Sequence, residues 1–392
     1  MKSYPLASTT WGLEEIAAIH EVIESGRFTM GNQVSLFEED FAKYIGSKFA
    51  VMVNSGSSAN LALLAASRYR KIPLLQPGDE VLVPAVSWST TYYPVSQLGA
   101  RLKFVDVNPN TLNIDVNKME EAITPATKAI LVVNLLGNPA DWDQINEIAV
   151  RNDLVLLEDN CESLGASLHG KRAGTFGIGG TFSTFFSHHI STMEGGLVVT
   201  DDESLFHTLR SIRAHGWTRD LPDVNHVHNK TGSQWDDLFR FVLPGYNLRP
   251  LEMEAAIGRI QLRKLDSFVE ARRENAKHFL SLANELDGFR IQEENGFSSW
   301  FGFSLILEGK LANRRQDLIV TLNEAAIESR PIVTGNFTRN PVINHLDYAP
   351  FGELPGADEV HDQGLFIGNH HFDLSDQIDR LGSVLDEFRR RF

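Results

Sequence analysis

The sequence predicts an α/β fold, with a parallel sheet covered by helices on both faces and a smaller mixed unit after it. Between residues 48 and 160, short apolar runs of strand length alternate with amphipathic stretches of helical length. Strands and helices that alternate in this way form parallel sheets that are buried on both faces. The chain has 392 residues, more than one typical core accommodates, which favours a second unit.

Five apolar runs are expected to form the large sheet. In chain order they are KFAVMVN (48–54), DEVLVPA (79–85), RLKFVDV (101–107), KAILVVNLL (128–136) and DLVLLEDN (153–160). Helical patterns separate them, for example at residues 57–70 and 117–124. Two further strands are expected in GGTFSTFF and GGLVVTDDE, on either side of residues 187–194. Binding sites in such sheets form at the C-terminal ends of the strands.

A long helical stretch at residues 251–286 is expected to lead into the second unit. We therefore predict a large cofactor-binding domain at residues 1–265 and a small α+β domain at residues 266–392. SSWFGFSLIL (298–307) is the strand candidate of the small domain. The polar segment 220–237 is predicted to be a loop, and its length indicates a function or a contact with another subunit.

The composition narrows the class of protein. A net charge of −15 and a pI near 5.3 disfavour nucleic-acid binding through a basic surface. The start MKSYPLASTTWG lacks the pattern of a signal peptide, and no apolar segment approaches the roughly 20 residues of a membrane span. We expect no contact with a membrane and a cytoplasmic location. The single cysteine, Cys161, excludes an internal disulfide and a cluster held by four cysteines of this chain.

Two strand ends carry polar groups suited to a charged ligand. In NSGSSAN (54–60), Gly56 and Ser57 open a helix directly after a strand, where backbone N–H groups and the helix dipole favour an anion. The same pattern fits a plain N-cap serine. In LLEDN, Asp159 ends a strand, and its carboxylate can pair with a protonated ring nitrogen or simply cap the next helix.

Other polar and aromatic candidates have equally ordinary alternatives. Trp88 follows a strand and can stack on a flat ring, although aromatic residues at sheet edges are more often core residues. Arg219 and Arg249 can clamp a carboxylate or phosphate, although most arginines form surface ion pairs. His215 fits a ligand contact or a histidine at a helix end. His188 and His189 are adjacent and lack zinc-ligand spacing, so a general base is favoured over a metal site.

Taken together, the segments resemble the sugar aminotransferase (DegT/DnrJ/EryC1-type) family of pyridoxal phosphate enzymes. The likeness runs from about residue 5 to the end, with matching order and spacing. It includes PGDEVLVPAVSW, VDVNPNTLNID, LLEDNCESLGA, MEGGLVVTDDE and GYNLRPLEMEAAIGRIQLRKL. The resemblance implies the aspartate-aminotransferase-like fold (type I), with a large parallel-sheet domain and a small α+β C-terminal domain.

The resemblance also implies the roles of single residues. Gly56, Ser57 and Ser183 match the phosphate ligands, and Trp88 matches the residue that stacks on the cofactor ring. Asp159 matches the partner of the pyridine nitrogen, and Glu162 stands where most members have a glutamine near the ring hydroxyl. Asn247 matches the residue that reaches the phosphate of the neighbouring subunit's cofactor. This implies a homodimer with shared active sites.

One position departs from the family. The lysine that normally holds the cofactor lies five residues after the serine matched by Ser183, and here that position is His188. A histidine cannot form the covalent bond that lysine makes with the cofactor aldehyde. We therefore expect pyridoxal 5'-phosphate or pyridoxamine 5'-phosphate to be held non-covalently.

A subgroup of the family shares this histidine, namely the 3-dehydratases of nucleotide-linked 4-keto-6-deoxy sugars. SHHISTMEGG, IRAHGWTR and RPIVTGNF carry that likeness. It implies that L-glutamate is the amino donor and that the C3 hydroxyl of a keto sugar leaves with His188 as the base, as part of lipopolysaccharide O-antigen biosynthesis. His215, Arg219 and Arg249 are then candidates for binding glutamate or the sugar. A related dehydratase uses an iron–sulfur cluster and a reductase partner, which the single cysteine argues against here.

Two other functions stay open on the sequence. One is a true aminotransferase with the same histidine, acting for example on an oxidised octulosonate for lipopolysaccharide. The other is an inactive protein that binds pyridoxal phosphate without converting it. The fate of the nitrogen distinguishes the first alternative from a dehydratase, and conversion of the cofactor by glutamate excludes the second.

Overall fold

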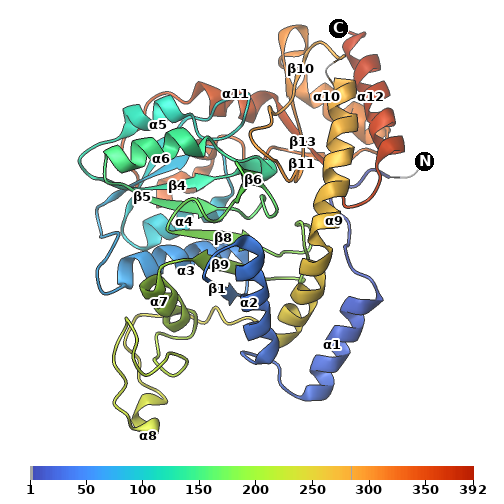
Figure 1. The fold of residues 1–392 in the computed structure, drawn as a ribbon. Coiled ribbons are helices and arrows are strands. Elements are labelled where there is room, and N and C mark those ends of the chain that lie inside the picture. Colours follow the sequence, from blue (N-terminus) through green and yellow to red (C-terminus); the bar gives the residue numbers. More distant parts are fainter. Residues whose placement is uncertain (1–2, 284) are drawn as a thin grey trace.

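A seven-stranded sheet forms the centre of the larger part of the molecule in the computed structural model, which describes residues 3–283 and 285–392 (Figure 1). The strand order is β1-β9-β8-β5-β4-β2-β3. The strands are β1 (Phe49–Val53), β2 (Glu80–Pro84), β3 (Arg101–Val105), β4 (Thr127–Val133), β5 (Val155–Asp159), β8 (Gly179–Ser183) and β9 (Gly196–Thr200). β1, β2, β3 and β5 lie wholly within the predicted apolar runs. β4 begins one residue before its run, and β8 and β9 lie in the two further segments.

The sheet is parallel except for β9. Strand β5 pairs in parallel with β4 and β8, and β2 pairs in parallel with β3 and β4. Strand β9 runs antiparallel to both of its neighbours, β1 and β8. This exception to the expected parallel sheet arises because β8 and β9 are joined directly, without the long crossover that parallel neighbours need. The connection, residues 184–195, therefore lies at the edge where the parallel strands end.

Helices cover both faces of the sheet. One face packs against α3 (Gly56–Tyr69), α4 (Ser89–Gln97) and α7 (Glu203–Arg213). The other face packs against α2 (Asn32–Ile45), α6 (Trp142–Arg151) and α9 (Glu252–Ala283), with α5 (Val116–Ala122) beside α6. Within β2, Val81 and Val83 join the first core and Leu82 joins the second. This alternation explains why the strands read as continuous apolar runs.

A second, four-stranded sheet forms the smaller unit. It has the order β10-β11-β13-β12 and is antiparallel throughout. Its strands are β10 (Phe289–Arg290), β11 (Gly302–Leu307), β12 (Ser329–Arg330) and β13 (Gly364–Gly368). The C-terminal part of α9 shares its core with α10 (Arg315–Glu324) and α12 (Ser375–Arg389).

Segments from each end of the chain pack into the core of the other unit. Helix α9 runs without interruption past residue 265, and α1 (Leu13–Ser25) packs on it. Tyr4 lies in the core of the smaller unit, whereas residues Ile332, Phe337 and Val360 pack into the core of the larger one. The domain boundary at residue 265 therefore remains a proposal. Both units contribute residues to the region where they meet.

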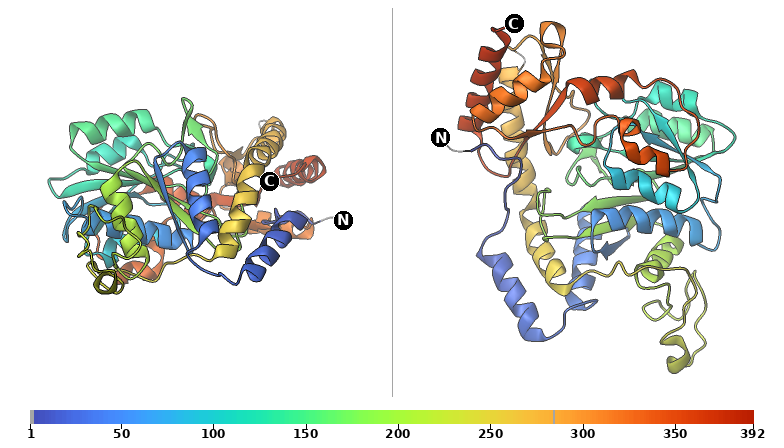
Figure 2. Two further views of the ribbon diagram at one scale, coloured as in Figure 1. Left: turned by 60° about the horizontal axis from the view of Figure 1, so that its bottom comes forward. Right: turned by 180° about the vertical axis from the view of Figure 1, so that it is seen from behind.

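The remaining elements are short, apart from α11 (Pro355–Gln363). They are η1 (Leu135–Gly137), β6 (Ser167–Leu168), β7 (Lys171–Arg172), α8 (Gln234–Asp237), η2 (Gly309–Leu311), η3 (Phe337–Arg339) and η4 (Pro341–His345). The predicted loop 220–237 is irregular except for α8 and protrudes from the body (Figures 1 and 2). In the part of the chain that the structure describes, no helix combines the length and apolarity needed to cross a membrane.

Candidate active site

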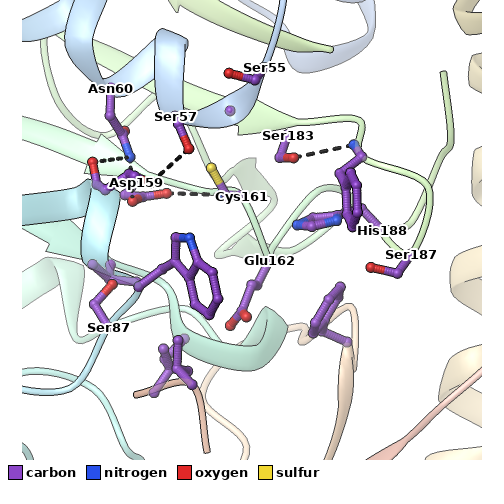
Figure 3. A pocket seen from close by; sticks show the side chains of 18 of the residues that line it. Ser55, Ser57, Asn60, Ser87, Asp159, Cys161, Glu162, Ser183, Ser187 and His188 are labelled. Carbon is purple, nitrogen blue, oxygen red and sulfur yellow. Dashed lines mark hydrogen bonds between the residues drawn. The ribbon is translucent and has the colours of Figure 1, made fainter. Parts of the chain in front are cut away.

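A cavity of about 320 Å³ lies at the C-terminal ends of the parallel strands, within the size range of small-molecule sites (Figure 3). Strands β1, β2, β4, β5 and β8 all end beside it, so that residues distant in sequence meet there. The smaller unit closes the cavity with residues at and beside β11 and β12. Seven of the residues predicted from the sequence line it: Gly56, Ser57, Trp88, Asp159, Glu162, Ser183 and His188.

The N-terminus of α3 forms one wall of the cavity. Ser55 caps the helix by accepting a hydrogen bond from the Ser58 N–H at 3.1 Å. A Cβ on Gly56 would lie 2.6 Å from the Ser183 Cβ, so only glycine permits β8 to approach the helix this closely. The hydroxyls of Ser57 and Ser183 and the first N–H groups of α3 therefore gather where the helix dipole favours an anion.

Asp159 presents a buried carboxylate at the end of β5. Its Oδ2 accepts hydrogen bonds from Asn60 Nδ2 and Thr91 Oγ1, both at 2.8 Å, and its Oδ1 accepts one from the Cys161 N–H at 3.1 Å. These donors lie on α3, on α4 and in the turn after β5, and they fix the carboxylate at the cavity wall. Figure 3 shows Asn60 and Cys161 beside Asp159. The preceding Glu158 points away and accepts three backbone N–H groups of residues 174–177. Of the two acidic residues, only Asp159 lines the cavity.

His188 lies in the β8–β9 connection and faces the cavity from the side opposite Asp159 (Figure 3). Its ring packs between Phe185 and Phe301, with centroid distances of 6.0 and 5.2 Å. Its Nδ1 is buried and has no hydrogen-bond partner. Burial, together with the charges of Arg330 and Arg272, lowers the pKa of His188 to about 3, so the imidazole is neutral at physiological pH. No lysine occurs among the described residues that line the cavity.

Glu162 and Arg330 bring opposite charges to the same cavity. Glu162 Oε2 accepts the Leu136 N–H at 3.1 Å, and burial raises the pKa of Glu162 while Arg330 partly offsets this effect. Arg330 ends β12, stacks on Phe366 at 4.4 Å, and has a buried Nε without a partner. Arg330 was not predicted as a site residue. It begins the RPIVTGNF motif of the dehydratase subgroup, but the motif does not show which of its side chains reaches the cavity.

Four predicted residues do not line this cavity. Asn247 is exposed and accepts a hydrogen bond from Arg249 Nε at 2.9 Å. Arg219 stacks on Trp217 at 3.7 Å, and the His215 ring lies 5.2 Å from the same indole. These residues gather beside the protruding segment, outside the cavity of their own chain. Their predicted roles require a cavity on another subunit.

The chemical types of the residues that line the cavity fit pyridoxal phosphate. The α3 N-terminus suits its phosphate, the buried Asp159 suits a protonated ring nitrogen, and Trp88, whose side chain is 55 % exposed, leaves an aromatic face available for stacking. His188 and Arg330 also line the cavity and bring an imidazole and a guanidinium to its wall. Among residues 3–283 and 285–392, no three metal-binding side chains are grouped to hold an ion.

Fold and cavity together define a cofactor-dependent enzyme with the architecture of aminotransferases. The chain belongs to the DegT/DnrJ/EryC1/StrS aminotransferase family, whose model matches residues 10–385. It is 55 % identical over 387 residues to a GDP-4-keto-6-deoxy-D-mannose 3-dehydratase from Yersinia pseudotuberculosis, covering 98 % of both chains. A dehydratase with the same designation from Escherichia coli O55:H7 is 54 % identical, with 98 % of this chain and 100 % of the relative covered.

Solved structures also show the likeness to this dehydratase. A crystal structure of GDP-4-keto-6-deoxymannose-3-dehydratase with a trapped PLP-glutamate geminal diamine superposes with a TM-score of 0.96 at 54 % identity. The match covers 97 % of this chain and 100 % of that one. A variant of the same dehydratase with bound GDP-perosamine matches equally well, with the same coverage, TM-score and identity. The family, the fold and the dehydratase likeness predicted from the sequence are confirmed.

Proposed function

We propose that this chain is a pyridoxal-phosphate- and glutamate-dependent 3-dehydratase that acts on GDP-4-keto-6-deoxy-D-mannose. The observation that carries the proposal is the neutral imidazole of His188 in a cavity that no lysine of the described residues lines. The two relatives designated as this dehydratase match nearly the whole chain. A histidine can move protons but cannot bond covalently to the cofactor. No lysine amine therefore takes the cofactor back before the eliminated product leaves, which suits the removal of a hydroxyl group.

The residues of this chain hold the cofactor without a covalent bond. The α3 N-terminus with Ser57 and Ser183 binds the phosphate, and Asp159 keeps the ring nitrogen protonated. When bound, pyridoxal phosphate supplies an aldehyde that takes up the amino group of glutamate and a ring that accepts the electrons of a broken C–H bond. Glu162 would hold the ring hydroxyl, and the raised pKa of its carboxyl would allow it to share a proton there.

His188 moves the protons in both halves of the reaction. Its imidazole would accept the α-proton of glutamate and return it to the aldehyde carbon of the cofactor, which leaves 2-oxoglutarate. With the sugar bound, the imidazole would remove a proton from that same carbon, and the resulting imidazolium would donate it to the C3 hydroxyl, which leaves as water. The released enamine would then be hydrolysed by water to the 3-deoxy ketone and ammonia.

Arg330 is our candidate for binding a carboxylate of glutamate within the same chain. Its guanidinium faces the cavity and has an unpartnered Nε, whereas Arg219 and Arg249 lie outside the cavity. A planar guanidinium binds a carboxylate through two parallel hydrogen bonds, which suits an amino acid donor. Arg330 lies close enough to Glu162 to lower the pKa of that carboxyl. The two described side chains form no ion pair, so Glu162 does not compete with a ligand for the guanidinium.

We further propose a homodimer in which each subunit completes the other's cavity. Asn247, His215, Arg219 and Arg249 are displayed outside their own cavity. The protruding segment beside them exposes apolar side chains, including Trp235 at 83 % and Phe239 at 64 %. Large exposed apolar patches of this kind mark protein interfaces. No reductase partner is required in this scheme, because glutamate, which is oxidised to 2-oxoglutarate, supplies both the amino group and the two electrons that reduce the sugar at C3.

The proposal is tested by following the nitrogen of ¹⁵N-glutamate. The protein is loaded with pyridoxal phosphate, and its absorbance spectrum and 2-oxoglutarate formation are recorded with glutamate before the GDP-sugar is added. We expect loss of the aldehyde absorbance, stoichiometric 2-oxoglutarate, and then labelled ammonia with a sugar that lacks the C3 hydroxyl. Label retained in the sugar would instead show an aminotransferase. An unchanged spectrum would show a protein that only binds the cofactor.

A further inference from the structure

Arg272 is a buried cation without a carboxylate partner. It lies on α9 with 3 % of its surface exposed, and its Nη1 donates to the carbonyl oxygens of Phe301 at 3.0 Å and Asn369 at 2.6 Å. Its Nε has no partner, and Arg272 forms no ion pair with any residue the structure describes. Burying an unpaired charge is costly, so this arrangement needs an explanation beyond stability.

Arg272 holds the segment at residues 299–301, and the adjacent His188 and His189 both pack against this segment. The Phe301 ring lies 5.2 Å from the His188 ring and 5.6 Å from the His189 ring. The Ser299 carbonyl oxygen lies 3.1 Å from His189 Nε2. The N–H groups of Ser299 and Phe301 bond to the η1 region at 2.9 and 3.0 Å. The hydrogen bond from Arg272 joins the Phe301 end of this segment to the long helix.

We propose that Arg272 is a positioning residue for His188, holding the Phe301 ring against the imidazole so that the ring keeps one orientation in the cavity. The inference rests on the proposed function, in which His188 transfers the protons. Arg272 itself does not line the cavity. Orientation matters because a proton acceptor must stay within hydrogen-bond reach of the carbon-bound proton throughout the reaction.

The charges around His188 support this role. Arg330 faces it from β12 and Arg272 from α9, while His189 adjoins it in the chain and Asp159, Glu162 and Glu194 line the same cavity. Burial lowers the pKa of Arg272 to about 10, so it is still protonated at neutral pH. After burial, Arg330 and Arg272 are the main causes that lower the pKa of His188 and keep it able to accept a proton.

The chain offers a matched control in the next residue of α9. Arg273 Nη1 also bonds to this segment, at the Ser298 carbonyl oxygen at 2.6 Å, and pairs with Glu294 at 2.6 Å. Its guanidinium stacks on Phe297 rather than on Phe301. Loss of Arg273 therefore weakens the same segment without releasing the ring that touches His188.

The test compares Arg272→Met with Arg273→Met in the full-length protein. The first readout is the single-turnover rate of cofactor conversion by glutamate, measured against pH and glutamate concentration. We expect Arg272→Met to lower the maximal rate about 10- to 100-fold, with less than about a threefold change in the glutamate concentration for half-maximal rate. The acidic limb of its pH profile moves to higher pH, because one nearby cation is lost. Arg273→Met keeps the wild-type profile.

The second readout does not depend on activity. Diethyl pyrocarbonate modifies neutral imidazoles, and peptide mass spectrometry resolves His188 from His189 in the cofactor-free protein. We expect the pH midpoint of His188 modification to rise by about one unit in Arg272→Met and to stay unchanged in Arg273→Met. Equal behaviour of the two variants in both readouts overturns the proposal.

A third variant covers the case in which Arg272→Met does not fold. Phe301→Leu keeps the backbone carbonyl that Arg272 binds but removes the aromatic face, and we expect a comparable loss of maximal rate. A wild-type rate in Phe301→Leu contradicts the positioning role. If the wild-type protein does not react with glutamate at all, the proposed function fails, while the modification experiment still decides whether Arg272 controls His188.

Discussion

At the scale of single residues, His188 determines what the cavity can do. The anion site, the buried carboxylate and the aromatic face are all suited to a pyridoxal phosphate enzyme, and the usual anchoring amine is the one part replaced. Histidine retains the ability to move a proton but cannot bind the cofactor covalently. The chemistry of the site and the strength with which it holds its cofactor are therefore separable by mutation.

Replacing His188 by glutamine tests this separation. We expect His188→Gln to bind pyridoxal phosphate with nearly unchanged affinity but to convert it with glutamate about 10²- to 10⁴-fold more slowly, because the proton acceptor is lost. Cofactor titration by fluorescence and single-turnover absorbance measure the two quantities separately. A weakened affinity with an unchanged rate constant would assign His188 to binding instead.

Gly56 is the residue on which the anion site depends. A methyl group there would collide with Ser183, so we expect Gly56→Ala to weaken cofactor affinity at least about tenfold and to lower the melting temperature. Gly352→Ala is the matched control, because a Cβ at that glycine meets no atom within 4 Å and its φ is not in the left-handed region. Similar affinities for the two variants would contradict the proposed phosphate position.

At the scale of elements, short connections position the working groups. The β8–β9 connection carries His188 and is held by hydrogen bonds between Thr184 and Thr192 and by Gln261 of α9, which accepts the Ser191 N–H at 3.1 Å. The N-terminal segment is tied in a similar way to the residues after β13. His370 lies 2.9 Å from Ser8 Oγ and 2.8 Å from the Pro5 carbonyl oxygen. The first tie lies within the larger unit, whereas the second joins the N-terminal segment to the smaller unit.

The His370 tie makes part of the stability depend on pH. Burial lowers the pKa of His370 to about 4, below its usual 6.5. The unfolded chain therefore takes up this proton first, so the stabilising contribution is present above pH 6.5 and is lost as the pH falls toward 4.

We expect wild type to exceed His370→Gln in unfolding free energy by about 1 kcal/mol at about pH 8. Below pH 6.5, this difference shrinks by about 1.4 kcal/mol per pH unit. Urea denaturation of both proteins at equal concentration measures it. A difference that does not change with pH would show that His370 is not the titrating group.

At the scale of the whole molecule, no single unit contains the site. The large sheet supplies the anion site and Asp159, the smaller unit supplies Phe301 and Arg330, and α9 connects them. The residues displayed beside the protruding segment do not line the cavity of their own chain. The dimer that we propose would give them a role, because a two-fold interface presents the same surface of each subunit to the other's cavity.

Complementation between variants tests this arrangement. We mix His188→Gln with Asn247→Ala under conditions that exchange subunits. In a mixed dimer with shared sites, one site carries both defects and the other carries none, so about a quarter of all sites regain wild-type activity. Light scattering confirms the dimer mass. Activity that stays at the average of the two variants would show that each subunit contains its complete site.

Much of this architecture could be predicted from the chain. The apolar runs became the strands of the large sheet, and the motifs at their ends placed seven of the site residues in one cavity. This worked because burial on both faces makes parallel strands continuously apolar, and because parallel strands bring their C-terminal ends to one edge. The antiparallel direction of β9 was not predicted, since a strand has the same pattern in either direction.

Sequence alone was sufficient for the fold class, the cofactor type and the loss of the anchoring lysine, because these depend on local pattern and on residue identity at matched positions. The contribution of Arg330, the unpaired charge of Arg272 and the placement of His215, Arg219, Arg249 and Asn247 outside their own cavity required the folded chain. Each depends on burial and on contacts between segments separated by many residues. Such distances are set by packing between helices and sheets, and no local pattern in the sequence encodes them.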